Sequence, residues 1–100
     1  MLGNLGEMAK MFSRLKDIQR GIKEYREEMP RLEFSASSED GSVTATVSGD
    51  LMVKRIEFAS APAKKAAIIE AVNAANMLAK NALRDKMREL SGGIDLPDIL

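Results

Sequence analysis

The chain has 100 residues, contains neither Cys nor His, and carries 15 basic and 15 acidic side chains. A chain of this length forms one domain, and folding buries only about 60–65% of its unfolded surface. Without Cys there are no disulfides and no thiolate chemistry, and without His the commonest general base and transition-metal ligand is missing. The composition therefore predicts a protein that is not an enzyme and takes no cofactor, metal or small-molecule substrate.

No apolar run approaches the roughly 20 residues that a membrane-spanning helix requires. Residues 1–7 also lack the basic and apolar regions of a signal peptide. We therefore expect a cytoplasmic protein without a membrane partner.

The apolar content of 45% overstates the size of the core, because thirteen of these residues are Ala and only four are aromatic. A core this small often needs a second chain to complete it. The composition predicts a homo-oligomer, and a two-fold dimer is the simplest one.

A long first helix is predicted over residues ~5–29. From Met8 to Met29 the apolar residues recur every three or four positions over three heptads, which is typical of an amphipathic helix. At about 1.5 Å per residue this helix reaches roughly 35–40 Å, so it is expected to project from the domain. Gly21 lies inside it, where a close contact or slight bend is a better explanation than a hinge, and Pro30 ends it.

The apolar period then changes to two, which predicts three strands. Leu32 to Ala36 alternate with polar residues, 39–42 has turn composition, and 43–48 alternates again. Gly49-Asp50 predicts a two-residue type II′ hairpin turn, and 51–58 forms the third strand. Consecutive strands with tight turns make an antiparallel meander.

The expected core residues of the third strand are Val53, Ile56 and Phe58. The first two have different parity, which indicates either a β-bulge or a strand buried on both faces.

A second long helix is predicted over ~62–90, with Pro62 in its first turn after a cap at Ser60 or Ala61. Gly92-Gly93 ends it. The domain thus covers 1–91 and an extended tail covers 92–100. The apolar stripe of this helix contains Ile69, Val72, Asn76, Ala79, Leu83 and Leu90, and a polar residue such as Asn76 on the stripe can fix helix register.

The charges are unevenly distributed. Residues 1–23 carry five bases and two acids, residues 80–90 carry four bases and two acids, and residues 24–79 carry six bases and nine acids. In an α-β-β-β-α chain the two helices are antiparallel, which places 8–23 beside 77–90, far from the sheet. A basic tip on an acidic body suggests nucleic acid as the partner. The candidate DNA-binding residues are Lys10, Arg14, Lys16, Arg20, Lys23, Lys80, Arg84, Lys86 and Arg88.

Four segments follow one another in a characteristic order: the Met-rich first helix, the glycine-bounded hairpin 41–49, Ala71-Val72-Asn73-Ala74-Ala75 in the second helix, and Gly92-Gly93 followed by Leu96-Pro97. These segments resemble motifs of the YbaB/EbfC family of bacterial nucleoid-associated proteins. They cover nearly the whole chain in the family's order. The resemblance implies a tweezer-like homodimer of α+β fold, with helical arms projecting from a sheet, that binds double-stranded DNA in the nucleoid with little sequence preference.

The function we predict is binding of double-stranded DNA through its phosphates, with low sequence specificity. Three alternatives remain at this stage. The basic residues can be an ordinary solvated helix face. The chain can be a dimeric protein-binding adaptor or chaperone-like module that uses the heptad helix and a Met-rich surface as a groove. It can also be a structural subunit of a larger assembly.

Overall fold

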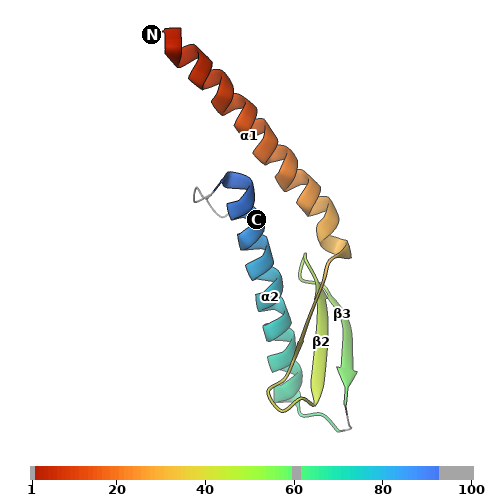
Figure 1. Ribbon diagram of the computed structural model, residues 1–100. Coiled ribbons are helices and arrows are strands. Elements are labelled where there is room, and N and C mark those ends of the chain that lie inside the picture. Colours follow the sequence, from red (N-terminus) through yellow and green to blue (C-terminus); the bar gives the residue numbers. More distant parts are fainter. Residues whose placement is uncertain (1, 60–61, 93–100) are drawn as a thin grey trace.

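The computed structural model describes residues 2–59 and 62–92, and its element order confirms the predicted α-β-β-β-α architecture (Figure 1). The elements are helix α1 (Leu2–Glu28), 3-10 helix η1 (Met29–Arg31), strands β1 (Glu33–Ser37), β2 (Val43–Ser48) and β3 (Val53–Phe58), and helix α2 (Lys65–Ser91). Helix α2 lies along the sheet and continues past the end at which α1 joins it (Figure 1), and the molecule measures 71 × 20 × 15 Å along its principal axes.

The sheet is an antiparallel meander in the order β1-β2-β3. β1 pairs with β2 in continuous register from Glu33↔Ser48 to Ser37↔Thr44. Between β2 and β3 the register shifts, because Thr46 pairs with Arg55 whereas the next residue, Val47, pairs with Val53. Lys54 is the extra residue of this bulge, so of the two explanations that the parity of the third strand left open, the β-bulge is confirmed.

The turn between β2 and β3 differs from the prediction. Leu51 donates its N–H to the carbonyl of Ser48 (3.0 Å), and Ser48 donates to the carbonyl of Met52 (2.8 Å), so the loop has three residues rather than two. The left-handed conformation falls on Leu51 (φ 67°) and not on Gly49. A three-residue loop built as a turn followed by one left-handed residue is the next commonest hairpin connection. The predicted type II′ turn is therefore wrong, and β3 begins at Val53 instead of Leu51.

Gly49 is needed for a different reason. Its N–H donates to the carbonyl of Met29 in η1 (2.9 Å). A side chain at this position would lie 2.9 Å from that carbonyl oxygen and 3.1 Å from Cα of Met29. The end of β2 and η1 approach each other so closely that only a residue without Cβ fits.

The core lies between one face of the sheet and α2. Alanines spaced four apart on α2 (Ala67, Ala71, Ala75 and Ala79) pack against the fully buried Val43, Ala45 and Val47 of β2. The predicted stripe of α2 is thus displaced: Ala79 belongs to it, but Ile69 is 60% exposed. Small side chains let the helix approach the sheet closely, and the alanine row lies at the closest line of contact.

The other face of the sheet is polar. Hydroxyls of facing residues on β1 and β2 hydrogen-bond across the strands, Ser35 to Thr46 (2.6 Å) and Ser37 to Thr44 (2.7 Å). Helix α2 packs on the opposite face, yet Thr46 and Ser48 on this face of β2 are fully buried.

Helix α2 begins later than predicted. Lys64 is its N-cap residue, with extended backbone and no side-chain cap, and Pro62 lies before the helix. Ala63 packs against the core, so residues 62–64 continue the crossing from β3 to the helix side of the sheet. The predicted caps Ser60 and Ala61 lie outside the described residues. At the other end Gly92 is the left-handed C-cap (φ 67°), as expected, whereas the extended tail predicted over 92–100 lies outside the described residues after Gly92.

The predicted burial of β3 is not found in the single chain. Val53, Ile56 and Phe58 are 49%, 37% and 52% exposed. They pair with buried residues of β2, so they face the side of the sheet that α2 occupies, but α2 packs on β1 and β2. The helix is too narrow to reach the third strand.

Neither helix, over residues 2–59 and 62–92, combines the length and apolarity that crossing a membrane requires.

Candidate nucleic-acid interface

The two helices meet where α2 ends. Leu90 packs against Gly21 of α1, and Lys86 lies over the ring of Tyr25 with its Nζ 6.0 Å from the ring centre. Further along α1, Arg14 donates from Nη2 to the carbonyl of Ser91 at 3.3 Å. Beyond Arg14, α1 continues past the last described turn of α2 (Figure 1). We call residues 4–20 of α1 the arm.

Three cations form a stripe along the arm and the turn that follows it. Lys16, Arg20 and Lys23 are spaced four and three apart, so they lie on one face of α1, and all three are exposed. Arg20 pairs with Asp17 one turn away, with side chains 65% and 64% exposed. Exposed pairs of this kind contribute at most about 1 kcal/mol, so a phosphate can replace Asp17 as the partner of Arg20.

The other two α1 cations of the predicted set have different surroundings. Lys10 is exposed on the outer half of the arm. Arg14, although exposed, is bound to the C-terminal end of α2.

A second stripe lies on α2. Lys80, Arg84 and Arg88 are four apart, are exposed, and turn away from the alanine row. Arg84 donates to the side chain of Asn81. Lys86 is on another face, between the helices, where it pairs with Glu89 (3.7 Å) and lies over Tyr25.

The structure does not bring all nine predicted residues to one tip. Arg14 contacts Ser91, which is seven residues and about 10 Å along α2 from Arg84. Lys80 follows Ala79, which is buried against the sheet. The basic residues are therefore spread along both helices, from the part of α2 beside the sheet to the outer half of the arm. They are spread in this way because α2 ends beside the middle of α1.

The basic residues of the sheet are neutralised locally. Arg55 donates to both carboxylate oxygens of Glu33 (2.8 and 3.3 Å), and Lys54 lies 3.8 Å from the same group. The hydrogen bond from Arg55 lowers the pKa of Glu33, and the same bond raises the pKa of Arg55. A bidentate pair is a strong form of salt bridge, so these two cations are less available to an anion than those of the arm.

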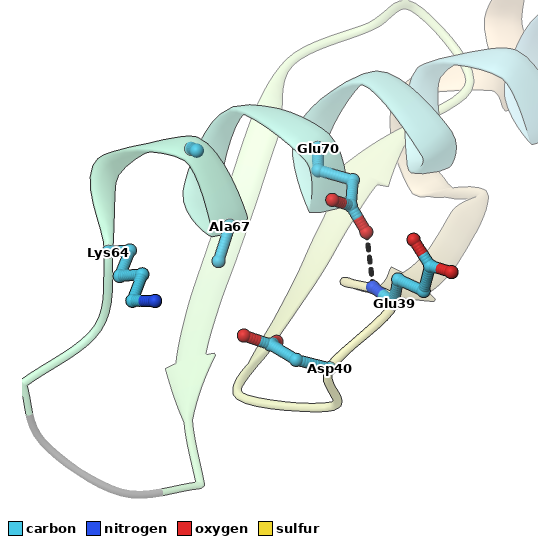
Figure 2. A pocket seen from close by; sticks show the side chains of 6 residues that line it. Glu39, Asp40, Lys64, Ala67 and Glu70 are labelled. Atoms are coloured by element: carbon cyan, nitrogen blue, oxygen red, sulfur yellow. Dashed lines mark hydrogen bonds between the residues drawn. The ribbon is translucent and has the colours of Figure 1, made fainter.

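The end of the molecule away from the arm is acidic. A shallow pocket there is lined by Glu39, Asp40 and Glu70 together with Lys64, and the backbone N–H of Glu39 donates to the carboxylate of Glu70 (Figure 2). Hydrogen bonds from Ser38 and Ser42 lower the pKa of Asp40 to about 2. With three carboxylates and one ammonium, this pocket repels phosphate. No acidic cluster with metal-binding geometry is found among residues 2–59 and 62–92.

The arm also carries an exposed apolar stripe. Five apolar side chains are 52–66% exposed: Leu5, Met8, Met11, Phe12 and Leu15. The heptad pattern that predicted the helix contains Met8, Met11 and Leu15 of this stripe, but not Leu5 or Phe12. It did not reveal that α2 is too short to cover the outer half.

Comparison with known proteins identifies the relatives of this chain. Residues 4–94 match the model of the YbaB/EbfC DNA-binding family. A nucleoid-associated protein of Synechocystis is 33% identical over 102 residues, covering 96% of this chain and 90% of its own length. Nucleoid-associated proteins of Prochlorococcus marinus (30% identical, 95% of this chain and 88% of the relative) and Gemmatimonas aurantiaca (33%, 91% and 94%) are similar over comparable lengths. The chain belongs to the YbaB/EbfC DNA-binding family.

Proposed function

We propose that this protein binds double-stranded DNA in the nucleoid through contacts to the phosphate backbone, with little sequence preference. The observation that carries the proposal is the pair of exposed cation stripes, Lys16, Arg20 and Lys23 on α1 and Lys80, Arg84 and Arg88 on α2. Family membership supports DNA as the polyanion. The acidic pocket lies at the opposite end, so positive and negative charge are separated between the two ends of the molecule. The helical end therefore faces the nucleic acid.

Low sequence specificity follows from the kind of side chain on these stripes. Most are long, flexible and exposed, and such groups neutralise phosphates without being held in a geometry that reads base edges. Phosphate contacts fix the position of a protein on the duplex, whereas base contacts specify a sequence.

The experiment is a titration of random-sequence duplex DNA by fluorescence anisotropy at several salt concentrations. Binding through phosphates makes the log of affinity fall with log salt by about 0.9 per phosphate neutralised. The variant Lys16→Gln/Arg20→Gln/Lys23→Gln should bind every duplex more weakly, with a slope reduced by up to about 2.7 per arm that is engaged. Its matched control is Lys54→Gln/Arg55→Gln on the sheet, which should change the slope less.

Two outcomes would count against this assignment. If the sheet variant loses DNA while the stripe variant keeps it, the helices are not the binding surface. A wild-type protein with no measurable affinity for duplex DNA at low salt would remove the proposed function itself.

We further propose that the protein acts as a homodimer, in which a second copy covers the apolar side of β3. Val53, Ile56 and Phe58 face the same side of the sheet as the core, but their exposed fractions are 49%, 37% and 52%. Strand β3 is also an edge of the described sheet. Exposed edges and apolar patches of this kind mark interfaces. A two-fold dimer would present two sets of helices to one duplex.

Sedimentation equilibrium at micromolar concentration tests the dimer. The wild type should have twice the mass of the chain, and Phe58→Asp should have the mass of a monomer, because a carboxylate would be buried without a partner. The control Phe12→Asp changes an aromatic residue on the arm that is 62% exposed, against 52% for Phe58, and should leave the mass unchanged. A wild-type monomer, or a Phe58→Asp dimer, would contradict the proposed interface.

A second candidate function is favoured by the apolar stripe of the arm. Five large side chains more than half exposed on eleven residues of one helix can hold a partner helix. Such binding would be nearly insensitive to salt, whereas DNA binding is steeply salt-dependent. Absence of salt-dependent binding to duplex DNA in the titration above would therefore favour this second function.

A further inference from the structure

Arg14 occupies a position that no other cation of the arm shares. Its Nη2 donates to the carbonyl of Ser91, the last residue of α2 and a fully buried one. The guanidinium also fills the space into which a side chain at Gly92 would project. Gly92 leaves that space open because it has no Cβ, and it is also the left-handed cap that ends the helix (φ 67°).

This arrangement joins opposite charges. The last carbonyls of a helix lack intrahelical partners and carry a partial negative charge, so a cation placed there is stabilised. The same partial charge repels a phosphate. A DNA strand that approached Arg14 would therefore have to compete with α2 for the guanidinium, which is not true of Lys16 or Lys23.

The contact between Arg14 and Ser91 also lies further from the sheet than the other named contacts between the helices. The other described contacts between the helices, Leu90 on Gly21 and Lys86 over Tyr25, lie seven or more residues closer to the sheet along α1. Beyond this contact the ribbon of α1 runs on past the last described turn of α2 (Figure 1). The contact of Arg14 is thus the furthest from the sheet of the three named contacts that hold α1 against α2.

We infer that Arg14 is a positioning residue: it ties the middle of α1 to the C-terminal end of α2 and sets the direction of the arm. It contributes to DNA binding through that direction and not through a phosphate contact. This role in binding rests on the proposed function, whereas the tie itself does not depend on it.

The test replaces the tie by a covalent one. The chain contains no Cys, so Gly21→Cys/Leu90→Cys introduces a single possible disulfide. A side-chain carbon at Gly21 would lie 3.3 Å from Cγ of Leu90, which places the two sulfurs within bonding reach. Arg14→Gln is then measured in this background, reduced and oxidised, with Arg20→Gln as the matched charge control.

We expect Arg14→Gln in the reduced form to weaken DNA binding severalfold with an unchanged salt slope, and oxidation to restore the affinity. Arg20→Gln should lower the slope by about 0.9, and oxidation should not restore it. If Arg14→Gln lowers the slope by a similar amount and the disulfide gives no recovery, Arg14 is a phosphate contact and the inference is wrong. Unchanged affinity in the reduced Arg14→Gln variant would also overturn it.

Hydrogen exchange of the free protein separates this inference from the proposed function. Amides of residues 10–18 should exchange faster in reduced Arg14→Gln than in the reduced parent, and oxidation should slow them again. Unchanged exchange would show that there is no tie, even if DNA binds. Faster exchange in a protein that does not bind DNA would leave the tie in place and remove only the proposed function.

Discussion

Replacement of Gly49 by alanine is expected to destabilise the protein strongly, although the backbone at this position is not left-handed. The new Cβ would lie 2.9 Å from the carbonyl oxygen of Met29, 3.1 Å from its Cα and 3.2 Å from its Cβ. Two of these atoms belong to the backbone of η1, so a side-chain rotation cannot relieve the overlap. The N–H of Gly49 donates to the same carbonyl at 2.9 Å, and moving the chains apart weakens this bond.

The magnitude follows from three terms. Forcing one extra carbon into a packed site costs about 1–3 kcal/mol, and a weakened hydrogen bond adds about 0.5–1.5 kcal/mol. Removing a glycine from the unfolded chain offsets about 0.4–1 kcal/mol. The net loss is about 2 kcal/mol, which lowers Tm by about 8–16 °C for a domain of this size.

The assay is thermal unfolding followed by circular dichroism, with all variants at one protein concentration because dimerisation would change Tm. Gly49→Asn distinguishes the two explanations of this glycine. Asparagine tolerates left-handed backbone, so it would be better than alanine if conformation were the reason, and no better if the contact with Met29 is the reason. A Gly49→Ala protein with the wild-type Tm would refute the close approach of β2 and η1.

Three further predictions concern single residues. Gly6→Ala should raise the free energy of unfolding by about 0.5–1 kcal/mol, since no atom lies within 4 Å of a Cβ added at this position of α1. Gly21→Ala should be nearly neutral, because the gain in helix propensity is offset by the methyl group of Leu90 that must move. Chemical unfolding of the two variants compares these effects. Asp40→Asn should reduce the loss of Tm between about pH 4 and pH 2, because a carboxyl group whose pKa is lowered to about 2 stabilises the fold above its unfolded pKa and loses this effect as pH falls. Gly92→Ala should lower Tm by about 4–8 °C, since its backbone is left-handed and Arg14 fills the adjacent space; an unchanged Tm would contradict the cap.

The order of elements, the antiparallel meander and the bulge in the third strand were all readable from the sequence. These features depend on contacts between near neighbours. An apolar period of three to four residues, the change to a period of two at Leu32, and the mixed parity of Val53 and Ile56 each reflect the local backbone. The family was readable for the same reason, because its motifs are turn glycines and small helix residues in a fixed order.

Tertiary contacts decided the rest. The residues Gly49-Asp50 favour a two-residue turn with a left-handed residue at Gly49. In the folded chain the carbonyl of Met29 lies next to Gly49, and the left-handed residue of the turn is Leu51. Because Ile69 is hydrophobic, the sequence predicted it on the buried stripe of α2. In the structure the residues that pack closely on β2 are the four alanines of the alanine row. Neither choice can be made from the residues that adjoin it in the chain.

The candidate site shows the same division. Charge counts located the basic stretches, and helix periodicity sorts them into stripes. The relative position of the two helices depends on where each leaves the sheet and on the length of α2, which ends at the middle of α1. That offset separates Arg84 from Arg14. It also places Arg14 at the C-terminal end of α2, where its partner Ser91 lies 77 positions away in the sequence. Only the folded chain brings a cation and the carbonyls of a distant helix terminus together, because their attraction acts through space and leaves no local pattern.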